Sequence, residues 1–327
     1  MTVCRKRIAI AVGDPNGIGP EIAVKAAWTL RGEPVDCVLV GDGFVLREQQ
    51  ARHAPGMTLA AFEPGAAREP DRLLWRETTA LPPPDYAPGE VRAAAGAAMV
   101  AYVREAVRLA RAGAVDAVVG CPHSEAAVAQ AGIAFSGYPG LIAQLTGTPA
   151  DRVFLMLASP ELKIGHATLH ESLRRALDRL DAELVVAAAL AAIEGARMTG
   201  IARPRLGVFG INPHAGEGGL FGDDDRAVTE PAVARLRAMG LDVDGPQGAD
   251  LMLAQRRHDV YLAMFHDQGH IPVKLLSPRQ ASALSVGGGV CFSSVGHGCA
   301  FDIAGQGRAD AAAVLRTVRL LAGLDGH

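Results

Sequence analysis

The feature that most limits what this chain can fold into is the alternation of short, β-branched runs with longer segments rich in alanine and leucine. The short runs predict strands at residues 7–13, 36–41, 116–121, 153–157, 163–170, 205–211 and 260–265. The longer segments predict helices at residues 20–30, 89–113, 173–198 and 229–239. This alternation is typical of an α/β fold with largely parallel sheets. Aromatic residues make up only 5% of the chain, which favours helices packed on parallel sheets over a β-sandwich.

The length and the charge of the chain limit its organisation and its partners. A chain of 327 residues predicts two domains, because one compact core seldom holds so many. The proline-rich residues 80–90 predict a surface loop before the longest helix. The formal net charge of −3 gives no reason to expect a nucleic-acid partner.

The cysteines and the apolar runs predict a cytoplasmic protein. Five cysteines, an odd number without a CxxC pair, are expected to be reduced thiols. The N-terminal apolar stretch is short, meets Asp14 and lacks the cleavage site of a signal peptide. The longest apolar run, residues 184–193, is about half the length of a membrane span, so no membrane partner is expected.

Reactive side chains follow several of the predicted strands. They are Asp14, Cys121, His123, His170, Asn212, His214, His266 and Asp267. In open α/β sheets, ligands bind where the loops at the carboxyl ends of the strands converge. The repeated placement of such groups at strand ends therefore predicts a functional site there.

Histidines stand out in the segments HATLHES, NPHAGEGG and FHDQGH. A single histidine is more often a satisfied polar residue than a metal ligand, but three from distant strand ends fit a catalytic zinc-type site. Asp250 and Asp267 are candidates for orienting such ligands or for acting as bases. His53, His258 and His327 lack this context and are expected at the surface.

Two glycine-rich stretches allow a functional and a structural interpretation. GDPNGIGPEI, residues 13–22, is a tight turn before a helix, and a helix N-terminus favours anions. A purely structural turn is an equal alternative there. GHGCAFDIAG, residues 296–305, would let a flat ligand approach the backbone, with Asp302 as a ribose or helix-cap acceptor.

The segments GDPNGIGPEI, GINPHAGEGGLFG, FHDQGHIPVK and GHGCAFDIAG resemble the 4-hydroxythreonine-4-phosphate dehydrogenase family over nearly the whole chain. The resemblance implies a fold similar to isocitrate and isopropylmalate dehydrogenases, with two α/β/α lobes and a cleft between them. The expected lobes are residues 1–125 with 280–327, and residues 126–279, which would carry the metal ligands and the dimer contacts.

The resemblance also implies a site and its cofactors. It implies a homodimer with a divalent metal at the subunit interface, held by His170, His214 and His266. His166 does not match a ligand position. Zinc is the expected metal, with iron, magnesium, manganese and cobalt as alternatives. The expected cofactor is NAD, with NADP as the alternative. Its binding residues would come from the GHGCAFDIAG loop, as His297, Gly298, Ala300 and Asp302.

The chain departs from the family where the family holds a substrate phosphate. Tyr138 and Pro139 replace a His-Thr pair that touches the substrate, and Ala283 and Phe292 replace an Asn and an Arg that help to hold its phosphate. Loss of the Arg contact and of the weaker amide contact would weaken phosphate binding by roughly 10²- to 10³-fold. A phosphorylated substrate is therefore not expected.

Within the family, CPHSEAAVAQAGIAFSGYPGL, HATLHES and VDGPQGADLMLAQRRHDVY resemble the branch that converts terephthalate cis-dihydrodiol to protocatechuate. The implied activity is a metal-dependent, NAD-linked oxidative decarboxylation. Lys274, Asp250 and Asp267 are the expected catalytic residues. Lys274, Tyr138, His123 and Phe292 are expected to contact the substrate, with His270 as a further pocket candidate.

Three other functions remain as alternatives. The first is the phosphorylated-substrate dehydrogenase of pyridoxal phosphate biosynthesis, which has the same chemistry and a different pocket. The second is a three-histidine zinc hydrolase, against which the GHGCAFDIAG loop argues because a hydrolase needs no dinucleotide. The third is a two-lobed binding protein without catalytic activity.

Overall fold

The computed structural model describes residues 5–65, 72–135, 137–277 and 280–324. The chain forms two compact units. Unit 1 comprises Met1–Leu141 and Val290–Gly326, and unit 2 comprises Ile142–Gly289. The sequence placed these divisions earlier, at residues 125/126 and 279/280. Helix α5 (Tyr138–Thr146) runs across the first division and so belongs to both units.

Unit 1 is built on parallel strands in the order β3-β4-β2-β1-β5-β12. Their bounds are β1 Lys6–Ala11, β2 Val35–Gly41, β3 Thr58–Ala61, β4 Arg72–Glu77, β5 Ala117–Gly120 and β12 Phe292–Ser294. The helices are α1 Gly19–Leu30, α2 Gly43–His53, α3 Ala93–Arg111, α4 Glu125–Gln130 and α11 Ala312–Ala322. Short 3₁₀ turns lie at Pro83–Asp85 and Phe301–Ile303.

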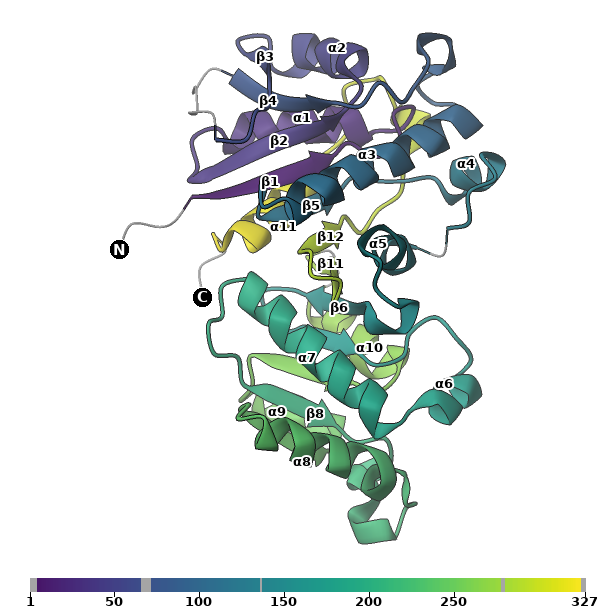
Figure 1. Cartoon of the computed structure of the whole chain (residues 1–327), viewed down its shortest axis with the longest axis vertical. Helices are drawn as coiled ribbons and strands as arrows, with labels where there is room; N and C mark the ends of the chain where they lie inside the picture. Colours follow the sequence, from purple (N-terminus) through teal and green to yellow (C-terminus); the bar gives the residue numbers. More distant parts are fainter. Residues whose placement is uncertain (1–4, 66–71, 136, 278–279, 325–327) are drawn as a thin grey trace. The chain divides into compact units, whose positions relative to one another are not determined.

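Helices cover both faces of the unit 1 strands. Helices α1 and α11 pack against each other and against β1 and β2, whereas α3 packs on β1, β2 and β5 from the other side (Figure 1). The central strands are buried almost throughout, as β1 shows with its sequence KRIAIA and four fully buried residues at its end. Continuous apolar strands of this kind are expected where a parallel sheet is covered on both faces.

Unit 2 contains strands in the order β11-β6-β7-β10-β8-β9, and only β6 pairs antiparallel with its neighbours among the described strands. Their bounds are β6 Phe154–Ala158, β7 Lys163–His166, β8 Leu206–Phe209, β9 Val243–Gln247, β10 Val260–Ala263 and β11 Ser282–Val286. The helices are α6 Leu173–Arg179, α7 Ala182–Met198, α8 Glu230–Ala238, α9 Ala249–Gln255 and α10 His266–Leu276. Single turns lie at Ala150–Arg152, Pro213–Gly219 and Asp225–Thr229.

Two glycines show which helix covers which face of unit 2. A Cβ on Gly165 of β7 would lie 2.9 Å from the Cβ of Ala192 in α7. A Cβ on Gly269 of α10 would lie 2.3 Å from Nε2 of His166. Successive residues of a strand point to opposite faces, so α7 and α10 cover opposite faces of these strands, as Figure 1 also shows.

The prediction of an α/β fold with largely parallel strands is confirmed. Each of the predicted strands overlaps an observed one. The predicted helix at 173–198 is divided by Asp181, whose side chain accepts a hydrogen bond from the amide of Leu184 and caps α7. The predicted strand at 260–265 ends at Ala263, and the histidines after it begin helix α10 instead.

Among the described residues, every helix is too short or too polar to cross a membrane.

Candidate functional site

The candidate site of unit 2 is formed where β7 and β10 end. His170 lies four residues beyond β7, and His266 is the first residue of α10. Their ring centroids are 5.7 Å apart. Both line a pocket of about 410 Å³ whose other walls are Leu169, Glu171, Leu173, Ala176, Phe265 and Asp267. The pocket combines apolar walls with two imidazoles, as a site for a small organic ligand would.

A carboxylate orients the imidazole of His266. Its Nδ1 lies 2.7 Å from Oδ1 of Asp267. A carboxylate only accepts hydrogen bonds, so Nδ1 is the donor of this bond and Nε2 is left for another partner. Metal-ligating histidines are typically held in this way. The position of Asp267 therefore fits an orienting role toward His266.

His214 has the same kind of partner on a different loop. Its Nδ1 lies 2.9 Å from Oε2 of Glu217. All five residues from His214 to Gly218 have φ between 44° and 80°, which makes this segment a left-handed turn. Non-glycine residues in that conformation cost roughly 1–2 kcal/mol each, and such strain is concentrated at functional sites. The turn therefore points to a function for the NPHAGEGG motif.

A buried aspartate holds the start of this turn. Asp225 is 1% exposed and accepts hydrogen bonds from the amides of Ile211 and Asn212 at 2.8 and 2.9 Å. It also accepts one from the hydroxyl of Thr229 at 2.6 Å. These contacts stabilise the backbone that leads into His214.

One chain brings together two of the three expected metal ligands. Over the described ranges, no group of three histidine, cysteine or acidic side chains is compact enough to hold a metal ion. His170 and His266 share a pocket, while His214 stays on its exposed turn. Asp250, in the first turn of α9, is exposed next to Gly248, where a Cβ would lie 3.9 Å from Cα of His214.

A second pair of histidines lies beside this pocket. His270 stacks on His266 with ring centroids 3.7 Å apart, and its Nδ1 is 3.0 Å from Nε2 of His166. Burial lowers the pKa of His166 to about 3, and burial, with His266 next, lowers the pKa of His270 to about 4. The rings of His166 and His270 are therefore both neutral at neutral pH. Lys274 follows one turn after His270 on α10 and is exposed.

The expected substrate residues of unit 1 form an aromatic cluster. His123 meets Phe135 and Tyr138 edge to face, with centroids 4.9 and 4.7 Å apart, and Tyr138 lies 4.7 Å from Phe292. The hydroxyl of Tyr138 donates to the carbonyl of Cys121 at 3.0 Å. Burial lowers the pKa of His123 although Glu125 opposes this effect.

The cluster depends on a glycine in β5. A Cβ on Gly120 would lie 2.8 Å from Cζ of Phe292 and 3.0 Å from the hydroxyl of Tyr138. Phe292 itself is fully buried and Tyr138 is 5% exposed. Phe292 therefore supports Tyr138 from behind, and His123 and Phe135 are the partly exposed rings of the cluster.

The expected cofactor loop is open, and its backbone is held at more than one point. His297, Gly298 and Asp302 are exposed, and a Cβ on Gly298 would meet no atom within 4 Å. Ala300 has a φ of 42°. The carbonyl of Cys299 accepts a hydrogen bond from the amide of Ile18 at 3.0 Å and fixes the loop. An exposed backbone and an available carboxylate fit a nucleotide.

The buried side chains of the GDPNGIGPEI turn have a structural role. The side chain of Asn16 is buried, accepts from the amide of Ala87 at 2.8 Å and donates to the carbonyl of Asp85 at 3.3 Å. These bonds fix the predicted proline-rich loop. Asp14 is also buried, and burial raises its pKa to about 6. This outcome matches the structural alternative for the turn.

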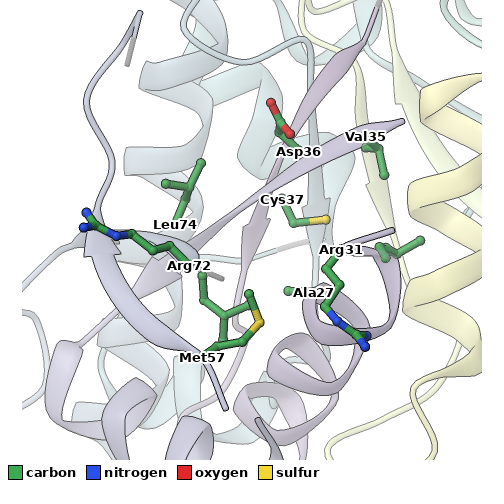
Figure 2. A pocket seen from close by; sticks show the side chains of 10 residues that line it. Ala27, Arg31, Val35, Asp36, Cys37, Met57, Arg72 and Leu74 are labelled. Carbon is green, nitrogen blue, oxygen red and sulfur yellow. The ribbon is translucent and has the colours of Figure 1, made fainter. Parts of the chain in front are cut away.

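Unit 1 also contains a small cavity beside Cys37, shown in Figure 2. Its volume of about 30 Å³ is about that of one water molecule in the liquid. Burial, with Asp36 next, raises the pKa of Cys37 to about 12, so the thiol stays protonated. This cavity is too small for a substrate.

One prediction from the sequence is wrong, and two residues of the site were not predicted. The side chain of His258 is 5% exposed and bonds Asp244 at 2.9 Å, so it is not the surface residue that was expected. His327 lies outside the described residues. The sequence analysis missed Glu217 and Asp225. An acidic residue three positions after a histidine in a glycine-rich run was the available signal for Glu217.

Comparisons with known proteins agree with these features. Residues 33–321 match the family described as Pyridoxal phosphate biosynthetic protein PdxA. The chain is 49% identical, over 100% of both chains, to 1,2-dihydroxy-3,5-cyclohexadiene-1,4-dicarboxylate dehydrogenase of a Comamonas species. It is 37% identical to 4-hydroxythreonine-4-phosphate dehydrogenase of Beijerinckia indica, over 94% of this chain and 91% of the relative.

A solved structure shows the same similarity. The crystal structure of a terephthalate 1,2-cis-dihydrodiol dehydrogenase from Burkholderia xenovorans matches with a TM-score of 0.83 and 51% identity. The match covers 97% of this chain and 98% of that one. The sequence-based identification of the family and of a dehydrogenase is thereby confirmed. The chain belongs to the PdxA family of dehydrogenases.

Proposed function

We propose that the protein catalyses the NAD-linked oxidative decarboxylation of terephthalate 1,2-cis-dihydrodiol to protocatechuate. The packing of Tyr138 on Phe292 over Gly120 carries this proposal. These rings stand where the family resemblance implies polar groups for a phosphate. A buried phosphate dianion without a cation would be costly, whereas apolar rings suit a flat diene. Two of the relatives named above, from Comamonas and Burkholderia xenovorans, are named as dehydrogenases of such a diol.

The proposed reaction proceeds in two stages. C2 of the diol loses a hydride to the nicotinamide, and its hydroxyl loses a proton, which makes a ketone β to the carboxylate on C1. The C1 carboxylate then leaves as carbon dioxide, and its electron pair closes the aromatic ring. A divalent metal, when bound, would supply a Lewis acid for the negative charge that develops on the oxygens.

The residues of unit 2 have separate roles in this proposal. His170, His214 and His266 would hold the metal, and Nε2 of His214 and of His266, left for another partner, fits that role. Lys274 would bind a substrate carboxylate. Asp250 is the proposed base, since Asp267 is already bonded to His266. In unit 1, His123 would contact the substrate, supported by Tyr138 and Phe292.

The cofactor would be NAD, with NADP as the alternative, and the metal zinc, since three neutral imidazoles suit it. The open loop with His297, Gly298, Ala300 and Asp302 supports a nucleotide there. Asp302 would accept a hydrogen bond from a ribose hydroxyl.

We also propose a homodimer whose interface completes the metal site. His170 and His214 are exposed, and within the described part of one chain His214 stays apart from the pocket that His170 and His266 share. Large apolar side chains are exposed on the same unit, among them Leu173, Leu177, Leu220, Phe221, Leu251, Ile271, Leu275 and Leu276. Exposed apolar side chains in this number favour a partner for unit 2, and a second chain would exclude water from the ligands.

The substrate is tested with the dihydrodiol and 4-phosphohydroxythreonine in parallel assays. NADH absorbance would be followed with both, and protocatechuate would be detected by chromatography. We expect kcat/KM for the phosphorylated substrate to be lower by at least about a hundredfold, from the lost hydrogen bonds. A higher kcat/KM for the phosphorylated substrate would contradict this proposal and support the alternative, the phosphorylated-substrate dehydrogenase of pyridoxal phosphate biosynthesis.

The shared site is tested by mixing two inactive variants, His170→Ala and His266→Ala. If the ligands of one metal come from different chains, a mixed dimer contains one intact site, and activity returns after subunit exchange. No recovery after verified exchange would assign both ligands to one chain, as their shared pocket allows.

A further inference from the structure

One face of α10 carries three polar groups at intervals of four residues. They are His266, His270 and Lys274. Residues four apart lie on the same helix face. His266 has a proposed role at the metal and Lys274 at a carboxylate. His270 lies between them and has no role in the proposed chemistry.

The hydrogen bonds of His270 begin at a buried histidine. His166, the last residue of β7, is 1% exposed, and its Nδ1 lies 3.2 Å from the carbonyl of Leu155. A carbonyl only accepts, so Nδ1 of His166 carries a proton. A ring this buried, with a carbonyl and an imidazole as its partners, is neutral. Its Nε2 is therefore bare.

The bare Nε2 of His166 determines the tautomer of His270. The two rings meet at 3.0 Å through Nε2 of His166 and Nδ1 of His270, and one proton must lie between them. Because His166 cannot supply it, Nδ1 of His270 does. The neutral His270 ring then has a bare Nε2, which points away from the buried partner on a half-exposed ring.

A glycine makes this contact possible. A Cβ on Gly269 would lie 2.3 Å from Nε2 of His166 and 2.9 Å from Cγ2 of Ile164. Any larger residue at position 269 would push α10 away from β7. The close approach of this helix to the strand is therefore built around the imidazole of His166.

We propose that His166 is a positioning residue that locks His270 in the Nδ1–H tautomer, so that Nε2 of His270 accepts a hydrogen bond from a substrate hydroxyl. This inference rests on the proposed function for the identity of the substrate. An acceptor at this position favours a hydroxyl and repels a carboxylate, which only accepts. Lys274, one turn later, has the opposite preference. The face of α10 thus matches a substrate that carries a hydroxyl and a carboxylate.

The tautomer is tested without any substrate. The zinc-loaded protein would be labelled with ¹⁵N-histidine, and the ring nitrogens of His270 would be assigned by comparison with His270→Gln. We expect a protonated Nδ1 and a bare, metal-free Nε2 in the wild type. His166→Leu, which lacks an acceptor, should increase the Nε2–H form. His166→Gln, whose amide oxygen can accept from His270, should keep the wild-type tautomer.

The hydroxyl contact is tested by kinetics with the dihydrodiol. His270→Leu should raise KM by about tenfold and change kcat by less than about threefold, since a ground-state hydrogen bond is lost. His166→Leu should raise KM by a smaller factor, and His166→Gln should rescue it. Zinc content and thermal unfolding of each variant separate this effect from loss of metal or fold.

Several results would overturn the inference. They are a bare Nδ1 on His270 in the wild type, a zinc-shifted Nε2, or an unchanged KM in His270→Leu. If the wild type does not oxidise the dihydrodiol at all, the proposed function fails and the hydroxyl contact fails with it. The spectra then still decide whether His166 locks the tautomer.

Discussion

Histidines occur in both units, and their surroundings give them different properties. In unit 2, His214 and His266 each have a carboxylate at Nδ1 and an exposed side chain. In unit 1, His123 is enclosed by Phe135 and Tyr138, and burial lowers its pKa. The first arrangement fits the proposed binding of a cation by a ring nitrogen, and the second fits the proposed contact with an apolar ligand. The partners of an imidazole, more than its presence, indicate its role.

The largest effect should come from removing an imidazole in unit 2. His214→Ala or His266→Ala should lower kcat by at least about a thousandfold, because the Lewis acid is lost with its ligand. Metal analysis of the purified variants should show loss of metal, and circular dichroism should show an intact fold.

The matched control is His53→Ala in unit 1, which should keep both metal and activity. Its side chain is half-buried near Gly307 and is not among the proposed metal ligands or substrate contacts. Full activity in a metal-free His214→Ala sample would exclude the proposed metal site.

In unit 1 the largest effect should be on stability. Phe292 is fully buried against Tyr138, and Phe292→Ala should lower the free energy of unfolding by about 3–5 kcal/mol. Urea titration measures this change. Phe135→Ala, from the less buried end of the cluster, should cost less. Equal costs for the two variants would contradict a support role for Phe292.

The sequence predicted the elements of the fold better than the contacts of the site. The strands were found because their apolar runs are buried on both faces, as in β1 and β10. The start of α10 was missed because VYLAMF continues the apolar pattern past Ala263, and periodicity cannot show where a strand stops.

The site residues were named from motifs, but motifs do not report burial. That Phe292 is hidden behind Tyr138 could not be predicted, because both residues are aromatic and the motifs carry no information on which of them is buried. Likewise, Glu217 reaches His214 only because the turn between them is left-handed, and a run of positive φ values at non-glycine residues goes against intrinsic preference. Tertiary contacts decided these cases.

An intermediate effect should follow from removing the carboxylate partners. Asp267→Asn and Glu217→Gln keep the size of the side chain but remove the charge at Nδ1 of the neighbouring histidine. Metal affinity should fall by about 10- to 100-fold. Competition with a chelator measures it.

The control for these variants is Glu230→Gln, which changes an exposed acid on α8 and should leave metal affinity unchanged. If metal affinity is unchanged in both Asp267→Asn and Glu217→Gln, the carboxylates do not contribute to metal binding. The carboxylate partners would then not distinguish the histidines of unit 2 from His123 of unit 1.

The smallest effect should come from the hydroxyl of Tyr138. Tyr138→Phe removes its hydrogen bond to the carbonyl of Cys121 and keeps the ring, so the free energy of unfolding should fall by about 1 kcal/mol. Tyr86→Phe loses a long 3.4 Å contact with Gln49 and a contact with Glu48 on a half-buried side chain, and it should change the free energy of unfolding by less than about 0.5 kcal/mol. Because the hydroxyl of Tyr138 is bonded to the backbone of Cys121, kcat/KM for the dihydrodiol should change by less than about threefold. A larger loss of kcat/KM with unchanged stability would mean that the hydroxyl binds substrate, and that unit 1 recognises its ligand through polar contacts as unit 2 does.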